Sequence, residues 1–319
     1  MILLIVLYML FASTFTIGKA ALSYTTPILF IGMRMVIAGF LLLSYLYFFK
    51  RSELRFNRKD LGVLSQVGLF QYYAAFILEF VALQSMTSGK ASLLWNFSPF
   101  VTALICYVVL DERLSLKKIA GLIIGFLGLL PILRATTPEE ELAGMISWFS
   151  VPELILLGAV FCGSYGWIAF TRAQERGYST LLINGLTMSV AGIAALITSF
   201  IVEGYPHIMP PASCLSQHMP TLCQLFGAYG AGIALFIGYS LLLILIANII
   251  CFNLYGYLLT VYSATFVSFA GFITPLFAAL FGRIFLQEQI GWPFIYALII
   301  VFFGLLLFFQ EELASSKKG

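Results

Sequence analysis

Two charged side chains lie inside segments that are otherwise free of charge. Glu79 is the only charged residue between Leu61 and Gln84, and Arg34 is the only one between Ile28 and Phe49. A single charge at the centre of a bilayer costs about 3 kcal/mol on insertion scales, and such residues often mark substrate pathways. Glu79 and Arg34 are therefore candidates for binding a solute that carries charge of both signs. A direct ion pair between them is the structural alternative, because it would lower the cost of both charges.

Polar and aromatic residues accompany these two charges at helical spacing. Tyr72 and Glu79 are seven residues apart, which places them on one stripe of a helix over 61–84. We predict that the substrate-binding residues are Glu79, Arg34, Tyr72, Trp95, Asn96, Asn248, Tyr255 and Trp167. The alternative for the stripe with Trp95 and Asn96 is a helix-packing seam.

Pro99 and Pro275 are expected at hinges or kinks. Proline has no backbone N–H and frees a carbonyl one turn earlier in a helix. Such breaks are tolerated in a membrane where a cavity rehydrates them, although a proline can also do no more than bend the helix.

The composition is that of a membrane protein. Hydrophobic residues make up 61% of the 319 residues and charged residues only 10%, with a net charge of +3 and a mean hydropathy of +1.01. The small net charge predicts no nucleic-acid partner, whereas the apolar composition predicts the lipid bilayer as one.

Ten segments are long and apolar enough to cross a bilayer as helices, since a span needs about 20 residues. They are 2–20, 28–49, 61–84, 88–110, 117–134, 152–172, 180–202, 230–258, 262–284 and 291–310. Most of the 17 basic residues lie in loops on one side, which predicts that both termini are cytoplasmic. Lys19 and Lys90 lie near the outer ends and are expected to extend toward the outer surface.

The two halves of the chain match each other. A shift of 176 places Pro99 on Pro275 and Glu112 on Glu288, and a shift of 153 places Gly39 on Gly192. Because five helices is an odd number, two such halves have opposite orientations in the membrane, with a site between them near the midplane. The fold predicted is all-α, with ten transmembrane helices as two inverted five-helix repeats around a central cavity. The expected divisions are a first repeat (1–134), an external linker (135–151), a second repeat (152–312) with a long external loop (203–229), and a cytoplasmic tail (313–319).

The residues at these matching positions also resemble a known family. The run Ser88-Gly89-Lys90-Ala91-Ser92, then Ser98-Pro99 and Asp111-Glu112-Arg113-Leu114, is similar to the EamA type of the drug/metabolite transporter superfamily. Its second copy is Thr274-Pro275 and Glu288. The resemblance covers nearly the whole chain and implies ten helices, a central cavity and no ATP-binding domain.

Motifs of other function classes are missing from the sequence. It contains no Walker loop, nucleophile elbow or HExxH motif, so we predict no enzyme activity, no catalytic residues, no cofactor and no metal site. Cys214 and Cys223 share the outer loop with His207 and His218. A disulfide between the two cysteines fits an oxidising periplasm, whereas the spacing matches no common zinc pattern.

The predicted function is secondary transport of a small organic metabolite by alternating access, in a bacterial inner membrane. One anion, one cation and several aromatic faces suit a zwitterionic or cationic amino acid or derivative. S-adenosylmethionine is the leading candidate, because some carriers of the resembled family handle it. The alternatives are a proton-coupled exporter of amino acids or drugs, a membrane-embedded enzyme, and a passive channel. The sequence leaves a monomer and a dimer equally open.

Overall fold

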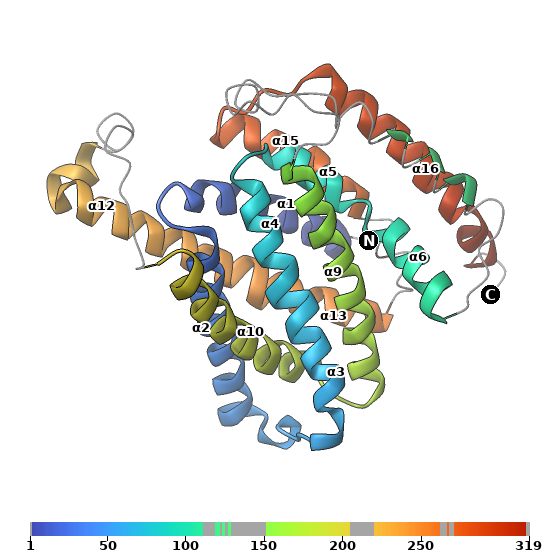
Figure 1. The fold of residues 1–319 in the computed structure, drawn as a ribbon, viewed down its shortest axis with the longest axis horizontal. Helices are drawn as coiled ribbons and strands as arrows, with labels where there is room; N and C mark the ends of the chain where they lie inside the picture. The colour runs from blue at the N-terminus through green and yellow to red at the C-terminus, as the bar shows by residue number, and fades with distance from the viewer. Residues whose placement is uncertain are drawn as a thin grey trace.

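The structure is a computed structural model in which every described element is a helix (Figure 1). It describes residues 2–110, 119–121, 123–124, 127–128, 151–204, 220–261, 267 and 271–316. Within these described residues, six helices are long and apolar enough to cross a membrane: Ile2–Leu22, Pro27–Phe49, Arg58–Leu83, Val151–Glu175, Thr180–Val202 and Gly232–Leu258. Two shorter apolar helices are Thr274–Phe285 and Trp292–Gly304. The predicted span 117–134 and the start of 262–284 lie largely outside the described residues.

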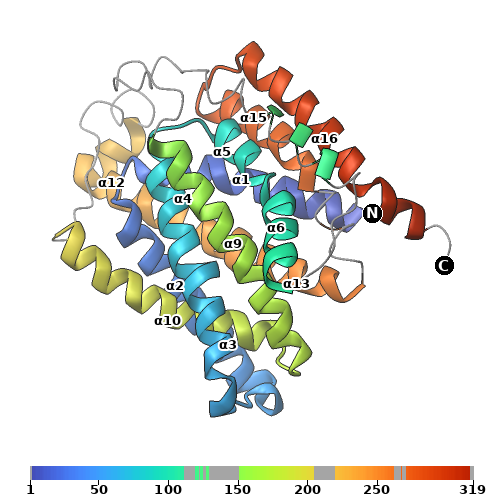
Figure 2. The same ribbon diagram turned by 45° about the vertical axis from the view of Figure 1, so that its right-hand side comes forward.

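The elements from the first part of the chain pack against those from the later part. They are α1 (Ile2–Leu22), α2 (Pro27–Phe49), the short turns η1 (Arg51–Glu53) and η2 (Arg58–Asp60), the continuous run α3–η3–α4 (Leu61–Gln66, Val67–Ala74 and Ala75–Leu83), α5 (Ser88–Trp95) and α6 (Ser98–Leu110). The later elements are α9 (Val151–Glu175), α10 (Thr180–Val202), the run α12–η4–α13 (Pro220–Leu243, Ile244–Cys251 and Phe252–Val261), η5 (Gly271–Ile273), α15 (Thr274–Phe285) and α16 (Trp292–Ser316). Helix α9 packs along α4 and η3, and α10 packs along α2 (Figures 1 and 2).

The predicted span 88–110 is two helices rather than one. Helix α5 ends at Trp95 and α6 begins at Ser98, with Pro99 as its second residue. A proline at that position cannot donate a hydrogen bond to the preceding turn, and its ring collides with the carbonyl four residues earlier. The same arrangement recurs at Thr274 and Pro275, where α15 begins directly after the 3₁₀ turn η5.

Two eight-residue π-helical segments interrupt the long helices. The segment η3 starts at Val67 and η4 starts at Ile244, a separation of 177 residues. Ser98 and Thr274, the first residues of α6 and α15, are 176 residues apart. π-helical turns are rare and are frequent at functional sites. The two segments therefore occupy corresponding places in the sequence. Each one precedes a helix break at a proline.

Helices α2 and α10 have the same length and contact each other at glycines. Each contains 23 residues, and their first residues, Pro27 and Thr180, are 153 positions apart. A Cβ atom on Gly39 would lie 2.6 Å from the Ser189 backbone nitrogen, and one on Gly192 would lie 2.6 Å from the Val36 backbone nitrogen. Only glycine permits so close an approach of two backbones.

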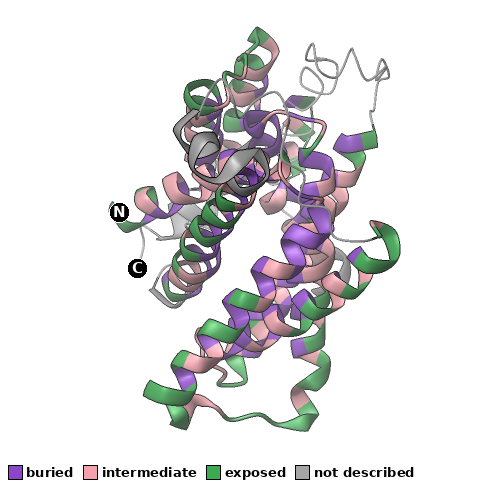
Figure 3. Cartoon of the chain, turned by 90° about the vertical axis from the view of Figure 1, so that its left-hand side faces the viewer, coloured by how far each residue is buried: buried purple, intermediate pink, exposed green. Residues whose placement is uncertain are grey.

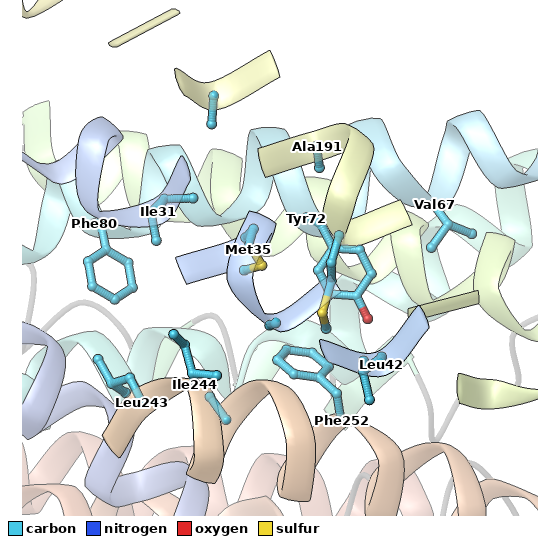
Figure 4. Packing of buried hydrophobic residues seen from close by; sticks show 14 of the residues in the cluster. Ile31, Met35, Leu42, Val67, Tyr72, Phe80, Ala191, Leu243, Ile244 and Phe252 are labelled. Atoms are coloured by element: carbon cyan, nitrogen blue, oxygen red, sulfur yellow. The ribbon is translucent and has the colours of Figure 1, made fainter. Parts of the chain in front are cut away.

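The main core lies where α2, η3, α10, η4 and α13 meet. Met35, Tyr72, Ile244 and Phe252 converge there, as Figure 4 shows. Exposed residues follow the outer faces of the long helices (Figure 3), and many of the exposed residues are large and apolar. Apolar outer surfaces of this extent are expected where helices face lipid.

Candidate functional site

A cavity of about 160 Å³ lies between the two sets of helices. Some of its lining residues come from the first part of the chain, on α1, α2, η3, α4, α5 and α6. The others come from the second part, on α9, η4, α13, η5 and α15. Six of the eight predicted substrate-binding residues line it, as does one predicted hinge: Arg34, Glu79, Trp95, Asn96, Trp167, Tyr255 and Pro99. Residues from distant parts of the chain therefore share one cavity.

Arg34 is buried within a cage of aromatic rings. Helix α2 places it with only 1% of its surface exposed. Its guanidinium carbon lies 5.7, 5.1 and 5.0 Å from the ring centres of Phe30, Phe76 and Phe80. At this distance the negative faces of the rings stabilise the cation. Two guanidinium nitrogens, Nε and Nη2, are buried without a hydrogen-bond partner in the protein.

Glu79 faces the same cavity from α4 and is 8% exposed. None of the Arg34 nitrogens lies within 4.0 Å of its carboxylate oxygens, so the two side chains form no ion pair. The direct pair that the sequence left open as an alternative is therefore not formed. Two opposite charges line one cavity, and each remains available to a bound molecule.

Two further hydrogen-bond donors are unsatisfied where α5 meets α6. Trp95 Nε1 and Asn96 Nδ2 are buried and line the cavity, and neither has an acceptor within 3.5 Å at hydrogen-bonding geometry, although the Trp95 indole lies near the Glu79 carboxylate. Most buried donors in proteins are satisfied, so each exception requires an explanation. Together with the Arg34 nitrogens they form a set of donors suited to the oxygen or nitrogen acceptors of a ligand.

Aromatic side chains on α9 and α13 form another part of the cavity lining. The ring centres of Trp167 on α9 and Tyr255 on α13 are 4.3 Å apart, and those of Trp167 and Phe252 are 5.9 Å apart. With the Gln71 amide oriented to satisfy both of its groups, its oxygen accepts from Trp167 Nε1 at 3.2 Å and its nitrogen donates to the Gly163 carbonyl at 2.8 Å. The indole is thus held in place by both packing and a hydrogen bond.

Tyr72 and Asn248 are buried beside the cavity and are not among the residues that line it. The Tyr72 hydroxyl donates to Asn184 Oδ1 at 2.6 Å, and Asn184 Nδ2 donates to Asn253 Oδ1 at 3.0 Å. Asn248 Nδ2 faces the Met35 sulfur at 3.1 Å. Tyr72 lies within the π-helical segment η3, so the regular spacing of an α-helix does not apply between it and Glu79. The seven-residue spacing therefore did not place the two side chains together.

Two lysines form ion pairs with glutamates that the sequence did not indicate. Lys19 and Lys90 were expected to extend toward the outer surface, and this expectation is wrong. Lys19 Nζ lies 3.1 Å from Glu288 Oε1, and Lys90 Nζ lies 2.6 Å from Glu153 Oε1. Each partner is far away in the sequence, so no local pattern could have indicated the pair.

The parts of the chain that the structure describes contain no group of three or more histidine, cysteine, aspartate or glutamate side chains that could hold a metal ion. Cys162 and Cys251 are free thiols. Cys214, His207 and His218 lie outside the described residues, as does Glu112, and Cys223 lies within helix α12.

Comparison with known proteins identifies relatives along nearly the whole chain. The model of the EamA-like transporter family matches residues 1–134 and 151–310. A protein of Chlamydia muridarum named S-adenosylmethionine/S-adenosylhomocysteine transporter is 32% identical over 307 residues, which cover 95% of this chain and 89% of the relative. A protein of the same name from Chlamydia trachomatis serovar D is 30% identical over 308 residues, covering 95% and 86%.

A solved crystal structure has the same fold. It aligns with a TM-score of 0.55 over 99% of this chain and 98% of its own, at 17% identity. The family match covers most of the sequence, and the relatives named above are transporters. This chain therefore belongs to the EamA-like transporter family, and it is a secondary transporter of the membrane rather than an enzyme.

Proposed function

We propose that this protein carries S-adenosylmethionine across the membrane by alternating access, with S-adenosylhomocysteine as its exchange partner. The observation that carries the proposal is the pair of opposite, unpaired charges, Arg34 and Glu79, in one cavity. S-adenosylmethionine has a carboxylate, an ammonium group, a sulfonium centre and an adenine ring. The relatives from Chlamydia that bear these two compounds in their name support this choice of substrate.

Each wall of the cavity suits one part of this molecule. The Arg34 guanidinium binds the substrate carboxylate through its free nitrogens, because guanidinium and carboxylate match in a two-bond geometry. The Glu79 carboxylate faces the cationic part. Trp95 Nε1 and Asn96 Nδ2 donate to acceptors of the ribose or the adenine, and the wall of Trp167 and Tyr255 takes the apolar and aromatic surface. Tyr72 and Asn248 stabilise the packing of the helices that carry Trp167 and Tyr255.

The architecture proposed is ten transmembrane helices in two inverted repeats, 1–134 and 152–312, with Pro99 and Pro275 as hinges. Three correspondences support it: α2 with α10, η3 with η4, and the starts of α6 and α15. In inverted-repeat carriers the substrate site lies between the repeats, and the lining of this cavity includes residues from both 1–134 and 152–312, which supports the proposal. We further propose that the protein lies in a bacterial inner membrane with both termini in the cytoplasm, as the distribution of Lys and Arg favours.

Uptake of radiolabelled S-adenosylmethionine by proteoliposomes tests the proposed substrate. We expect saturable uptake that increases when the vesicles contain unlabelled S-adenosylhomocysteine and that excess external S-adenosylmethionine abolishes. Empty liposomes and the Arg34→Ala variant are the controls. Folded protein that transports other amino acids but neither of these compounds would refute the proposal.

A proton-coupled amino-acid exporter is the second candidate. A relative from Salmonella typhimurium named probable amino-acid metabolite efflux pump is 25% identical over 230 residues. The buried carboxylate of Glu79 could exchange a proton in such a cycle. Amino-acid efflux that stops when the proton gradient is collapsed would favour this candidate over exchange.

A further inference from the structure

A cluster of charged and polar groups joins three elements near the N-terminal end of helix α5. Glu288, which follows α15, accepts hydrogen bonds from the Ser88 backbone nitrogen at 3.0 and 3.1 Å and from the Ser88 hydroxyl at 3.2 Å. Lys19, near the end of α1, lies 3.1 Å from the same carboxylate and donates to the Met86 carbonyl at 2.8 Å. The Glu288 side chain is 7% exposed, so these contacts are shielded from solvent.

The backbone around Glu288 is shaped to bring its carboxylate to Ser88. Gln287 has a φ of 55°, the only positive φ outside glycine in the described residues. The Glu288 backbone nitrogen donates to the Gly282 carbonyl at 3.1 Å, which folds the chain back over the end of α15. The carboxylate then lies against Gly282, where any larger residue would displace it. A positive φ is uncommon for a non-glycine residue and indicates that the surrounding structure imposes this backbone conformation.

This cluster lies one helical turn beyond the cavity. Phe15 and Ser92 line the cavity, and Lys19 and Ser88 are four residues away from them on α1 and α5. Residues four apart in a helix share a face. A second buried ion pair, between Lys90 on α5 and Glu153 on α9, ties the same turn of α5 to another element. Both connections join elements that precede residue 134 to elements that follow residue 151.

We propose that Lys19, Ser88 and Glu288 form a gate that closes one end of the cavity and positions helix α5 over it. The proposal rests on the alternating-access function given above, because such a carrier has to separate its two halves at each end in turn. Helix α5 carries Ser92 and Trp95 into the cavity, so release of Glu288 from its first turn also moves the substrate-facing residues. The three residues act by positioning, since none of them lines the cavity itself.

Glu203 provides a matched control within the same chain. Its carboxylate also caps a helix from the other half: it accepts from the backbone nitrogens of Ile28 and Leu29, each at 2.9 Å. It differs from Glu288 in that it lies at the α2–α10 contact and is not next to the cavity. If the variants lose only a helix cap, Glu203→Gln and Glu288→Gln should change access to the cavity alike. If Glu288 is part of a gate, only Glu288→Gln should change that access.

The test measures access to the cavity from each side of the membrane. Ser92→Cys is introduced into protein whose five native cysteines are replaced by alanine, and its reaction with a membrane-impermeant thiol reagent is followed in sided vesicles. We expect Glu288→Gln to raise the labelling rate several-fold from the side on which α5 begins and to lower it from the other. Lys19→Gln, which removes the ion pair and leaves the cap, should shift both rates in the same directions.

Each outcome bears on the gate separately from the substrate, because labelling requires no transported compound. Unchanged labelling in folded Glu288→Gln and Lys19→Gln proteins would overturn the gate even if S-adenosylmethionine is transported. An equal change in Glu203→Gln would also overturn it. If Glu288→Gln does not fold, the Lys19→Gln result decides alone. In transport assays the gate predicts a larger change in kcat than in KM for Lys19→Gln.

Discussion

The buried polar groups of the cavity are unusual in lacking partners within the protein. Arg34 Nε and Nη2, Trp95 Nε1 and Asn96 Nδ2 are four donors that the surrounding residues leave free. A buried donor without a partner costs about 1–3 kcal/mol. Such groups are retained where a ligand supplies the missing acceptor, which is why we assign the substrate carboxylate and heteroatoms to them.

Glu79→Gln tests the proposed anionic contact with the substrate. The amide keeps the shape of the side chain and loses the charge, so the protein should insert and fold while kcat/KM for S-adenosylmethionine falls by roughly 10–100-fold. This range corresponds to about 1.5–3 kcal/mol for a hydrogen bond to a charged group. Uptake kinetics in proteoliposomes measure the change, with Glu175→Gln at an exposed helix end as control. Near-normal uptake would leave Glu79 with a packing role.

The contact of Arg34 with the substrate is tested by Arg34→Lys and by a charge swap. Lysine keeps the charge and loses the two-bond geometry, so KM should rise about tenfold for S-adenosylmethionine. An analogue lacking the carboxylate should be affected far less. Because Arg34 and Glu79 form no ion pair, the double variant Arg34→Glu, Glu79→Arg should not recover transport. Full recovery by the swap would show that the pair serves structure alone.

At the scale of elements, carboxylates and cap residues at helix ends also connect the two parts of the chain. Glu203 caps α2 and also accepts from the hydroxyl of its N-cap residue, Thr26, at 2.8 Å. Ser179, the N-cap residue of α10, is hydrogen-bonded to Glu53. This bond and the one from Lys50 lower the pKa of Glu53 below its usual value. The carboxylate that follows α10 therefore caps α2, whereas the carboxylate that follows α2 contacts the N-cap residue of α10.

Gly39→Ala tests the close contact of α2 and α10. The added Cβ would lie 2.6 Å from the Ser189 backbone nitrogen and 2.8 Å from the Gly185 carbonyl oxygen, so the helices have to move apart. Overpacking of this kind costs about 1–3 kcal/mol. We expect a lower melting temperature of the purified protein in detergent. Gly238→Ala is the control, since nothing lies within 4 Å of its added Cβ; equal losses in both variants would contradict a specific contact.

The whole molecule places its charges in a way that favours exchange over proton-driven accumulation. Arg34 and Glu79 line the same cavity, so the empty carrier already holds a cation together with an acid there. We expect labelled S-adenosylmethionine to enter vesicles only when they contain unlabelled substrate, with no response to an imposed pH gradient. Counterflow with and without that gradient is the measurement. Accumulation driven by the gradient alone, and lost in Glu79→Gln, would instead support proton coupling.

Patterns local to the sequence were sufficient for the class of protein and for several helices. The apolar runs at 2–20, 28–49, 61–84, 152–172 and 180–202 correspond to α1, α2, α3–α4, α9 and α10. The helix break at Pro99 is likewise predictable from the chemistry of the proline alone. These features are predictable because hydrophobic length and proline geometry act within a few turns of chain. The transporter family was likewise identified from the motifs and is confirmed by the match over residues 1–134 and 151–310.

Only the tertiary structure decided which polar residues meet. Tyr72, in the π-helical segment η3, donates to Asn184, 112 residues away, and does not line the cavity that Glu79 faces. Lys19 meets Glu288, and Arg34 is surrounded by phenylalanines rather than paired with Glu79. Helical spacing predicts which residues share a face of one helix. The packing of helices against each other determines what that face contacts. Partners that are distant in the sequence are set by this packing.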